Sequence, residues 1–62
     1  MTGTIKSFSR PHGYGFIKSG REDVFFHVKD WTGKNDPVVG EQVDFMWIES
    51  EKGLRATRVR RL

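Results

Sequence analysis

Two short alternating runs lie at the centre of the sequence, within residues 12–28, HGYGFIKSGREDVFFHV. Aromatic and β-branched residues recur in residues 14–18 and again in residues 23–28, and a polar stretch that contains Gly20 separates them. Short runs of this kind with a glycine-containing break between them are typical of a β-hairpin. We therefore predict two strands joined by a turn over residues 19–22.

Outward from this hairpin, the sequence predicts three more strands, over residues 3–9, 42–50 and 54–61. Proline and glycine in residues 10–13 mark a turn, and residues 29–41 form one long connection. In the last strand Val59 is out of phase with Leu54 and Ala56, which predicts a bulge or a strong bend. No segment has a helical apolar period. A flat sheet of this size leaves two open edges, so the predicted fold is all-β, a closed five-stranded antiparallel barrel.

Strand alternation also predicts which side chains face the core. We expect seven residues inside the barrel: Ile5, Ile17, Val24, Phe26, Val43, Phe45 and Trp47. The same alternation leaves Tyr14, Phe16, Phe25 and His27 outside on adjacent strands. The opposite registry would bury a histidine and a tyrosine hydroxyl, which is costly without partners. An exposed apolar patch of this kind usually marks an interaction site.

Length and composition limit the other possibilities. The chain has 62 residues and 7.2 kDa, enough for a single domain over residues 1–62, and it reads as complete. It has no cysteine, which excludes disulfides and cysteine-ligated zinc, and two histidines alone make no metal site. No apolar run approaches membrane-spanning or signal-peptide length, so we expect a cytoplasmic protein that contacts no membrane. We expect no cofactor and no small-molecule substrate.

Charge is distributed unevenly along the chain, whose net charge is +3. Residues 1–21 hold four basic residues and no acid, residues 22–51 hold all eight acids and two lysines, and residues 52–62 hold five basic residues. If the fold brings the two ends together, they make one cationic face that suits a polyanion. A solvated surface of mixed charge is the alternative reading.

Exposed rings beside cations are the means by which proteins hold single-stranded nucleic acid, because every base offers a π-face for stacking. Three alternatives stay open: an aromatic patch that recognises a protein, rings that simply belong to the core, and an architectural barrel that wedges a duplex minor groove. An enzyme is not expected, because the sequence has no phosphate-binding loop, no HExxH motif and no nucleophile near a base.

Three segments together resemble the cold-shock domain family: residues 3–8 (GTIKSF), 12–17 (HGYGFI) and 23–27 (DVFFH). In order they are similar to the first strand of that family and to its two ribonucleoprotein-like motifs, and VGEQVDF follows at residues 39–45. The resemblance covers nearly the whole chain. It implies an oligonucleotide-binding (OB-fold) barrel that binds single-stranded RNA or DNA and loosens RNA secondary structure as a chaperone, without catalytic activity.

Carried over by position, the resemblance implies stacking on the four rings named above, phosphate contact or flanking charge at Lys6 and an edge role for Phe8. This chain departs from the family pattern at Ser7, where a tryptophan is usual, at His12, where a lysine is usual, and at Val28, where an aromatic is common. Trp31 either supplies the lost ring or packs as a lid on the barrel end. The candidate nucleic-acid-binding residues are Lys6, Phe8, His12, Tyr14, Phe16, Phe25, His27, Trp31 and Arg55. We expect a monomer or a dimer that exchanges strands across residues 29–41.

Overall fold

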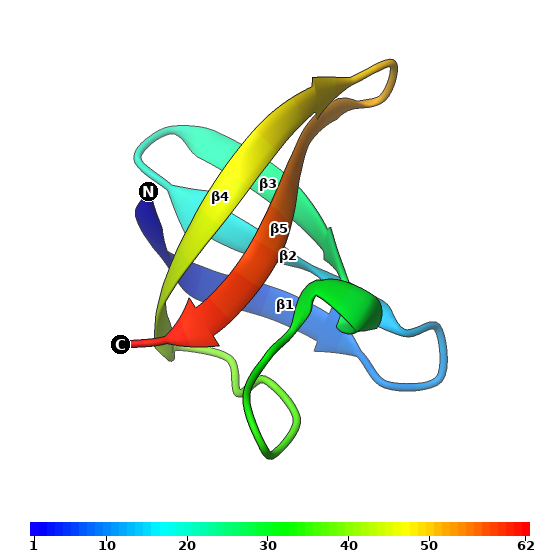
Figure 1. Cartoon of the computed structure of the whole chain (residues 1–62), viewed down its shortest axis with the longest axis vertical. Coiled ribbons are helices and arrows are strands. Elements are labelled where there is room, and N and C mark those ends of the chain that lie inside the picture. The colour runs from blue at the N-terminus through cyan, green and yellow to red at the C-terminus, as the bar shows by residue number, and fades with distance from the viewer.

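A computed structural model describes all residues, 1–62, and contains the five expected strands. They are β1 (Thr2–Ser9), β2 (Tyr14–Ser19), β3 (Glu22–His27), β4 (Gln42–Ser50) and β5 (Gly53–Arg61), with a short 3-10 helix, η1 (Val28–Asp30), after β3 (Figure 1). The first and last residues of every strand lie within one residue of the predicted positions. Val28, predicted as the end of a strand, is instead the first residue of η1. The single short helix has neither the length nor the apolar character that a membrane-spanning helix needs.

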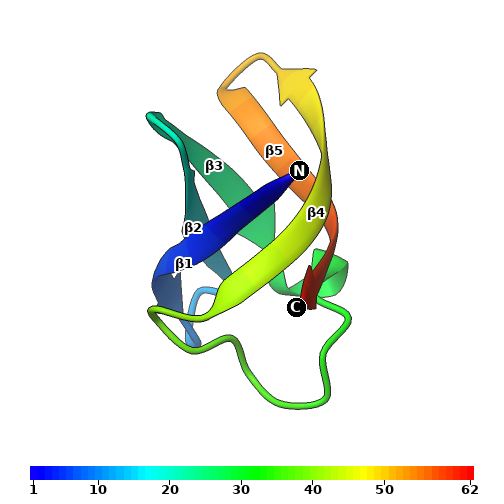
Figure 2. The same cartoon turned by 90° about the vertical axis from the view of Figure 1, so that its left-hand side faces the viewer.

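The strands close into a barrel in the order β1-β2-β3-β5-β4 (Figures 1 and 2), which confirms the predicted fold class. One detail of that prediction needs correction. The β3–β5 ladder is parallel, with Phe25 opposite Arg55, whereas the other four ladders are antiparallel. The reason is the odd number of strands: five strands in a ring cannot alternate in direction all the way round, so one neighbouring pair must run the same way.

Two register shifts change which side chains face the core. Between Asp44–Arg60 and Met46–Thr57, β5 has two residues where β4 has one, and Arg58 at this point has φ 50°. This bulge confirms the irregularity predicted at Val59, since the extra residue lets both Ala56 and Val59 face inward. The second shift lies between Ile5 and Ser7 of β1.

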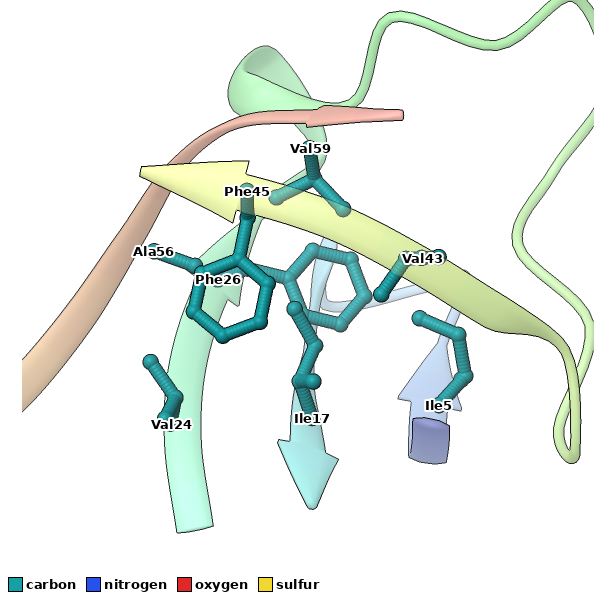
Figure 3. Close-up of a cluster of buried hydrophobic side chains, with 8 residues drawn as sticks. All are labelled: Ile5, Ile17, Val24, Phe26, Val43, Phe45, Ala56 and Val59. Carbon is teal, nitrogen blue, oxygen red and sulfur yellow. The ribbon is translucent and has the colours of Figure 1, made fainter. Parts of the chain in front are cut away.

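Eight residues form the core: Ile5, Ile17, Val24, Phe26, Val43, Phe45, Ala56 and Val59 (Figure 3). Full burial of a valine, isoleucine or phenylalanine side chain contributes about 1.5–3 kcal/mol, so this small cluster is the main stabilising feature. Six of the seven predicted core residues are buried. The prediction for Trp47 is wrong, because its side chain is 44% exposed. The β1–β4 ladder ends at Asp44, so β1 does not extend to the position of Trp47 and leaves its ring uncovered.

The long connection closes one end of the barrel. Trp31 is half-buried against the core, its backbone bridges to Val59, and its Nε1 donates to the Asn35 carbonyl at 2.6 Å. The Arg61 guanidinium lies 5.0 Å from the centroid of the indole. A Cβ at Gly33 would come within 2.6 Å of the same ring, so only glycine fits there. These contacts fix the path of the chain between β3 and β4.

Candidate nucleic-acid interface

The β2–β3 hairpin places four rings on the outer face of the barrel. Its ladder pairs Tyr14 with His27 and Phe16 with Phe25, while the alternate side chains, those of Phe26, Ile17 and Val24, fill the core. Tyr14 and Phe16 are 37% and 36% exposed, and their two partners are half-buried. The inward and outward assignment predicted for this hairpin is therefore confirmed. We call these four residues the ring surface.

Three rings of this surface, those of Tyr14, Phe25 and Phe16, touch in a continuous row. Tyr14 and Phe25 have centroids 5.5 Å apart, and Phe16 meets Phe25 edge to face at 5.9 Å and 74°. His12 extends the row beyond Tyr14 at 5.7 Å. Contacts of this length stabilise ring orientation, so the row presents π-faces whose positions are set before any ligand arrives.

The two histidines are held by different hydrogen bonds. Nδ1 of His27 accepts the backbone N–H of Lys29 at 3.1 Å and so caps η1. This bond requires Nδ1 to be unprotonated, which leaves Nε2–H as the donor that His27 offers to a ligand. His12 lies in the turn before β2, where its Nδ1 meets the Ser9 hydroxyl at 2.7 Å.

Gly15 brings β1 directly beneath the ring surface. A Cβ at this residue would lie 2.2 Å from the Ser7 carbonyl oxygen and 2.9 Å from the Phe8 Cα, both backbone atoms. The glycine between Tyr14 and Phe16 is thus required by close strand packing. Phe8 is half-buried and stacks on Phe26, with centroids 6.0 Å apart and ring planes 13° apart, because the β1 register shift turns its side chain toward the core. It does not lie in the row of rings.

Acidic side chains hold the cations that flank the ring surface. Lys6 Nζ is 2.9 Å and Lys18 Nζ 3.6 Å from the carboxylate of Asp23. The Lys6 hydrogen bond is the main reason that the pKa of Asp23 lies below its ordinary value. On the other side, Arg55 pairs with Asp30 at 3.2 Å, and its Nε is buried without a partner. A phosphate would compete with these carboxylates for the cations.

A hollow of about 650 Å³ adjoins the ring surface. Phe16 and Phe25 form one wall, Leu54 and Arg55 another, and residues 50–52 of the β4–β5 turn close it. Arg55 stands directly opposite Phe25 in the parallel ladder, so a cation adjoins the row of rings here.

Acidic residues neutralise part of the basic C-terminal end. Arg60 pairs with Asp44 at 3.1 Å, and Arg61 pairs with Glu41, so both arginines are matched by acids from the middle of the chain. Trp31 lies at the barrel end beside Arg61 and makes no contact with the row of rings. The structure thus brings Tyr14, Phe16, Phe25, His27, His12 and Arg55 together, with Lys6 on the β1 side.

Sequence reasoning missed Asp23 and Asp30, the two carboxylates that hold these cations. Asp23 stands opposite Lys18 in the hairpin, so the alternation that predicts the rings would also have revealed that pair. The pairing of Asp30 with Arg55 joins residues 25 positions apart through the β3–β5 contact, and no local pattern signals it.

Comparison with known proteins shows the family of this chain. The family model of the 'Cold-shock' DNA-binding domain matches residues 1–62. Cold shock-like protein CspLB of Listeria monocytogenes is 36% identical over 65 residues, which cover 100% of this chain and 98% of that protein. Cold shock domain-containing protein CG9705 of Drosophila melanogaster is 49% identical over 47 residues, which cover 73% of this chain and 33% of that protein.

The chain thus corresponds to about a third of the length of some curated relatives and to nearly all of others. Among solved structures, the Drosophila Unr CSD456 structure superposes with a TM-score of 0.79 at 28% identity, covering 98% of this chain and 26% of the Unr chain. Because the family model spans the whole chain and CspLB matches it from end to end, the chain belongs to the 'Cold-shock' DNA-binding domain family.

Proposed function

We propose that the chain binds single-stranded RNA or DNA and acts as an RNA chaperone that holds strands in the unpaired state. The observation that carries this proposal is the contiguous row of exposed rings on the β2–β3 hairpin. Each stacked base contributes about 1–3 kcal/mol, and stacking accepts any base. Bases inside a duplex are already stacked on one another, so such a row favours unpaired strands.

The proposed roles follow the position of each side chain. Tyr14, Phe16, Phe25 and His27 stack on bases, and His12 lengthens the row. Lys6 and Arg55 bind phosphates after releasing their carboxylate partners. Phe8 and Trp31 enter the proposal as rim residues, since both pack partly on the core. The protein would act in the cytoplasm, where binding to unpaired segments shifts an RNA hairpin equilibrium by mass action and without ATP.

Titration of a fluorescein-labelled oligothymidine, followed by anisotropy, tests this proposal. We expect saturable binding that weakens between about 50 and about 200 mM salt, with a log–log slope of about −0.7 per phosphate neutralised. A duplex of the same length should bind more weakly. Preference for duplex would instead support minor-groove wedging, and absence of binding to any single strand would contradict the proposal.

The chaperone activity needs a separate measurement. A hairpin RNA labelled with a fluorophore and a quencher should open at a lower temperature when the protein is added, with no nucleotide cofactor present. The variant Phe16→Ala serves as the control, because it removes one stacking ring while leaving all eight core residues in place. Equal opening by both proteins would show that the ring surface does not act in this process.

A further inference from the structure

A second hollow, of about 540 Å³, lies on the side of the barrel away from the ring surface. β4 and the last part of β5 form it, together with Met1 and Thr32. In the closed barrel β4 borders only β1 and β5, so it lies across the barrel from the β2–β3 hairpin (Figure 2). We call it the arginine hollow, after Arg58 and Arg60, which both line it.

Positive charge exceeds negative charge in the arginine hollow. Asp44 is the only acid that lines it, against Arg58 and Arg60. The hydrogen bond from Arg60 holds the pKa of Asp44 below its ordinary value, so this carboxyl is ionised at neutral pH. The two guanidinium groups still outnumber it. The Met1 amino group, which bonds to the Phe45 carbonyl and lies 3.5 Å from Asp44, is positive as well.

Most of the guanidinium N–H groups in the arginine hollow have no partner. Arg60 bonds to Asp44 through Nε and Nη2, at 3.3 and 3.1 Å, which uses two of the five N–H groups of a guanidinium. Arg58 forms no ion pair with any acid of the chain. The Thr32 hydroxyl donates to the Val59 carbonyl at 2.9 Å and has no second proton to offer. The donors available to a ligand are therefore those of the two arginines.

The backbone of Arg58 adds an independent observation. Its φ of 50° lies in the left-handed region, at the bulge where β5 has one residue more than β4. Glycine adopts this conformation without strain and is the usual residue at such a bulge. Arginine therefore costs stability here, and its guanidinium group pairs with no acid that would compensate. Backbone outliers of this kind gather at functional sites.

We propose that the arginine hollow binds a phosphate group between the guanidinium groups of Arg58 and Arg60. Val59 between them faces the core, so both arginines stand on the outer side of β5. The planar guanidinium group matches the oxygens of a phosphate with paired N–H donors. Arg60 keeps its bonds to Asp44 and donates from its remaining N–H groups, while Arg58 gains the anionic partner that the chain does not provide.

Two sources carry such a group: a free phosphate ion, and the backbone of a nucleic-acid strand. Because the arginine hollow lies across the barrel from the ring surface, a strand bound there would be a second strand beside the one on the rings. This extension to a second strand rests on the proposed function. The binding of phosphate itself does not, since it needs only Arg58 and Arg60.

Titration of the full chain with sodium phosphate, followed by two-dimensional ¹H–¹⁵N NMR, tests the site without nucleic acid. Sodium chloride keeps the ionic strength constant, so that general screening does not change. We expect saturable shifts at the amides of Asp44, Arg58 and Arg60, with half-saturation at about 1 to 30 mM, as for a weak ligand held by exposed charges. Absence of saturable shifts at these amides would overturn the proposal.

Two variants of one residue separate binding from folding. Arg58→Gly and Arg58→Ala remove the same guanidinium group, but only glycine relieves the backbone strain. We expect both variants to bind phosphate about fivefold more weakly, although only Arg58→Gly gains stability in thermal unfolding. Arg21→Ala removes an exposed arginine without an ion pair from the β2–β3 turn and should bind like the parent. Equal phosphate affinity of all three variants would contradict the proposal.

A second titration distinguishes the two sources. The protein is first saturated with one equivalent of a short oligothymidine and then receives a second equivalent. New shifts at Asp44, Arg58 and Arg60 in this second step, weakened in Arg58→Ala, would assign the site to a strand. A response to the phosphate ion alone would assign it to free phosphate. If no strand binds the ring surface, the proposed function fails, and the phosphate titration still decides on the arginine hollow.

Discussion

Phe16 and Phe25 stand opposite each other across the β2–β3 ladder, with ring centroids 5.9 Å apart and planes at 74°. Each ring therefore supports the orientation of the other, in addition to any contact with a ligand. We expect Phe16→Ala and Phe25→Ala each to weaken oligonucleotide binding by about 1–3 kcal/mol. The double variant should lose less than the sum, because either single change already loosens the remaining ring.

A double-mutant cycle by anisotropy measures this coupling, and urea unfolding of each variant shows whether the fold is kept. Leu62→Ala, at a residue 71% exposed, should leave binding unchanged. Loss of cooperative unfolding together with unchanged affinity of the folded fraction would mean that the rings belong to the core and not to a binding surface.

Asp23 competes with phosphate for Lys6 and Lys18. Its replacement by asparagine should raise the affinity for single strands about two- to fivefold at low salt, since the exposed ion pair that it removes is weak. The advantage should shrink as salt screens the cations. Glu22→Gln removes the same charge one residue away at a side chain without an ion pair. An equal gain from Glu22→Gln would indicate a general charge effect.

Gly15→Ala should destabilise the barrel by about 3 kcal/mol or more, because the new Cβ would overlap backbone atoms of Ser7 and Phe8 that have no room to move. Gly20→Ala meets no atom within 4 Å and carries only the strain of φ +60°, for which we expect about 1 kcal/mol. Denaturant midpoints compare the two. Similar losses at both positions would contradict the packing role of Gly15.

Arg58→Gly should stabilise the fold. The left-handed conformation at φ 50° costs a non-glycine residue about 1–2 kcal/mol, and glycine avoids this strain. The more flexible unfolded state of a glycine chain offsets about 0.5–1 kcal/mol of that gain. We expect a net gain of about 0.5–1 kcal/mol in the free energy of unfolding. Arg58→Ala removes the same side chain but keeps the strain, so thermal unfolding should show no comparable gain for it.

Acid should weaken the fold through its paired carboxylates. The hydrogen bonds from Arg61 to Glu41 and from Arg60 to Asp44 hold both pKa values below the ordinary 4.5 and 3.8. As the pH falls through that range, the unfolded chain takes up protons before the folded one, so the free energy of unfolding decreases until the folded carboxyls are protonated too.

Urea unfolding between about pH 5 and about pH 2.5 measures this loss. Glu41→Gln should flatten the pH dependence, because it removes one of the perturbed groups. Glu49→Gln, at an exposed carboxyl without an ion pair, should retain the full dependence. A parallel decline in all three proteins would exclude Glu41 as a source.

Alternation was sufficient to predict the hairpin and its faces. Tyr14, Phe16, Phe25 and His27 are outward for the same local reason that Ile17, Val24 and Phe26 are inward: successive side chains of a strand point to opposite sides. The bulge at Val59 was also visible, as a break in phase. These features depend on neighbours in the chain, so local sequence pattern was enough to predict them.

The remaining features depend on contacts between segments that are far apart in the chain. By alternation along β4, Trp47 should face the core. It is exposed because β4 extends several residues beyond its pairing with β1. Phe8 turns inward through a register shift in β1, and Arg55 is held by Asp30 across a parallel ladder that exists only once five strands have closed. Pairing between distant segments sets the strand lengths, the register and the closure of the barrel. The hydrophobic period alone does not encode them.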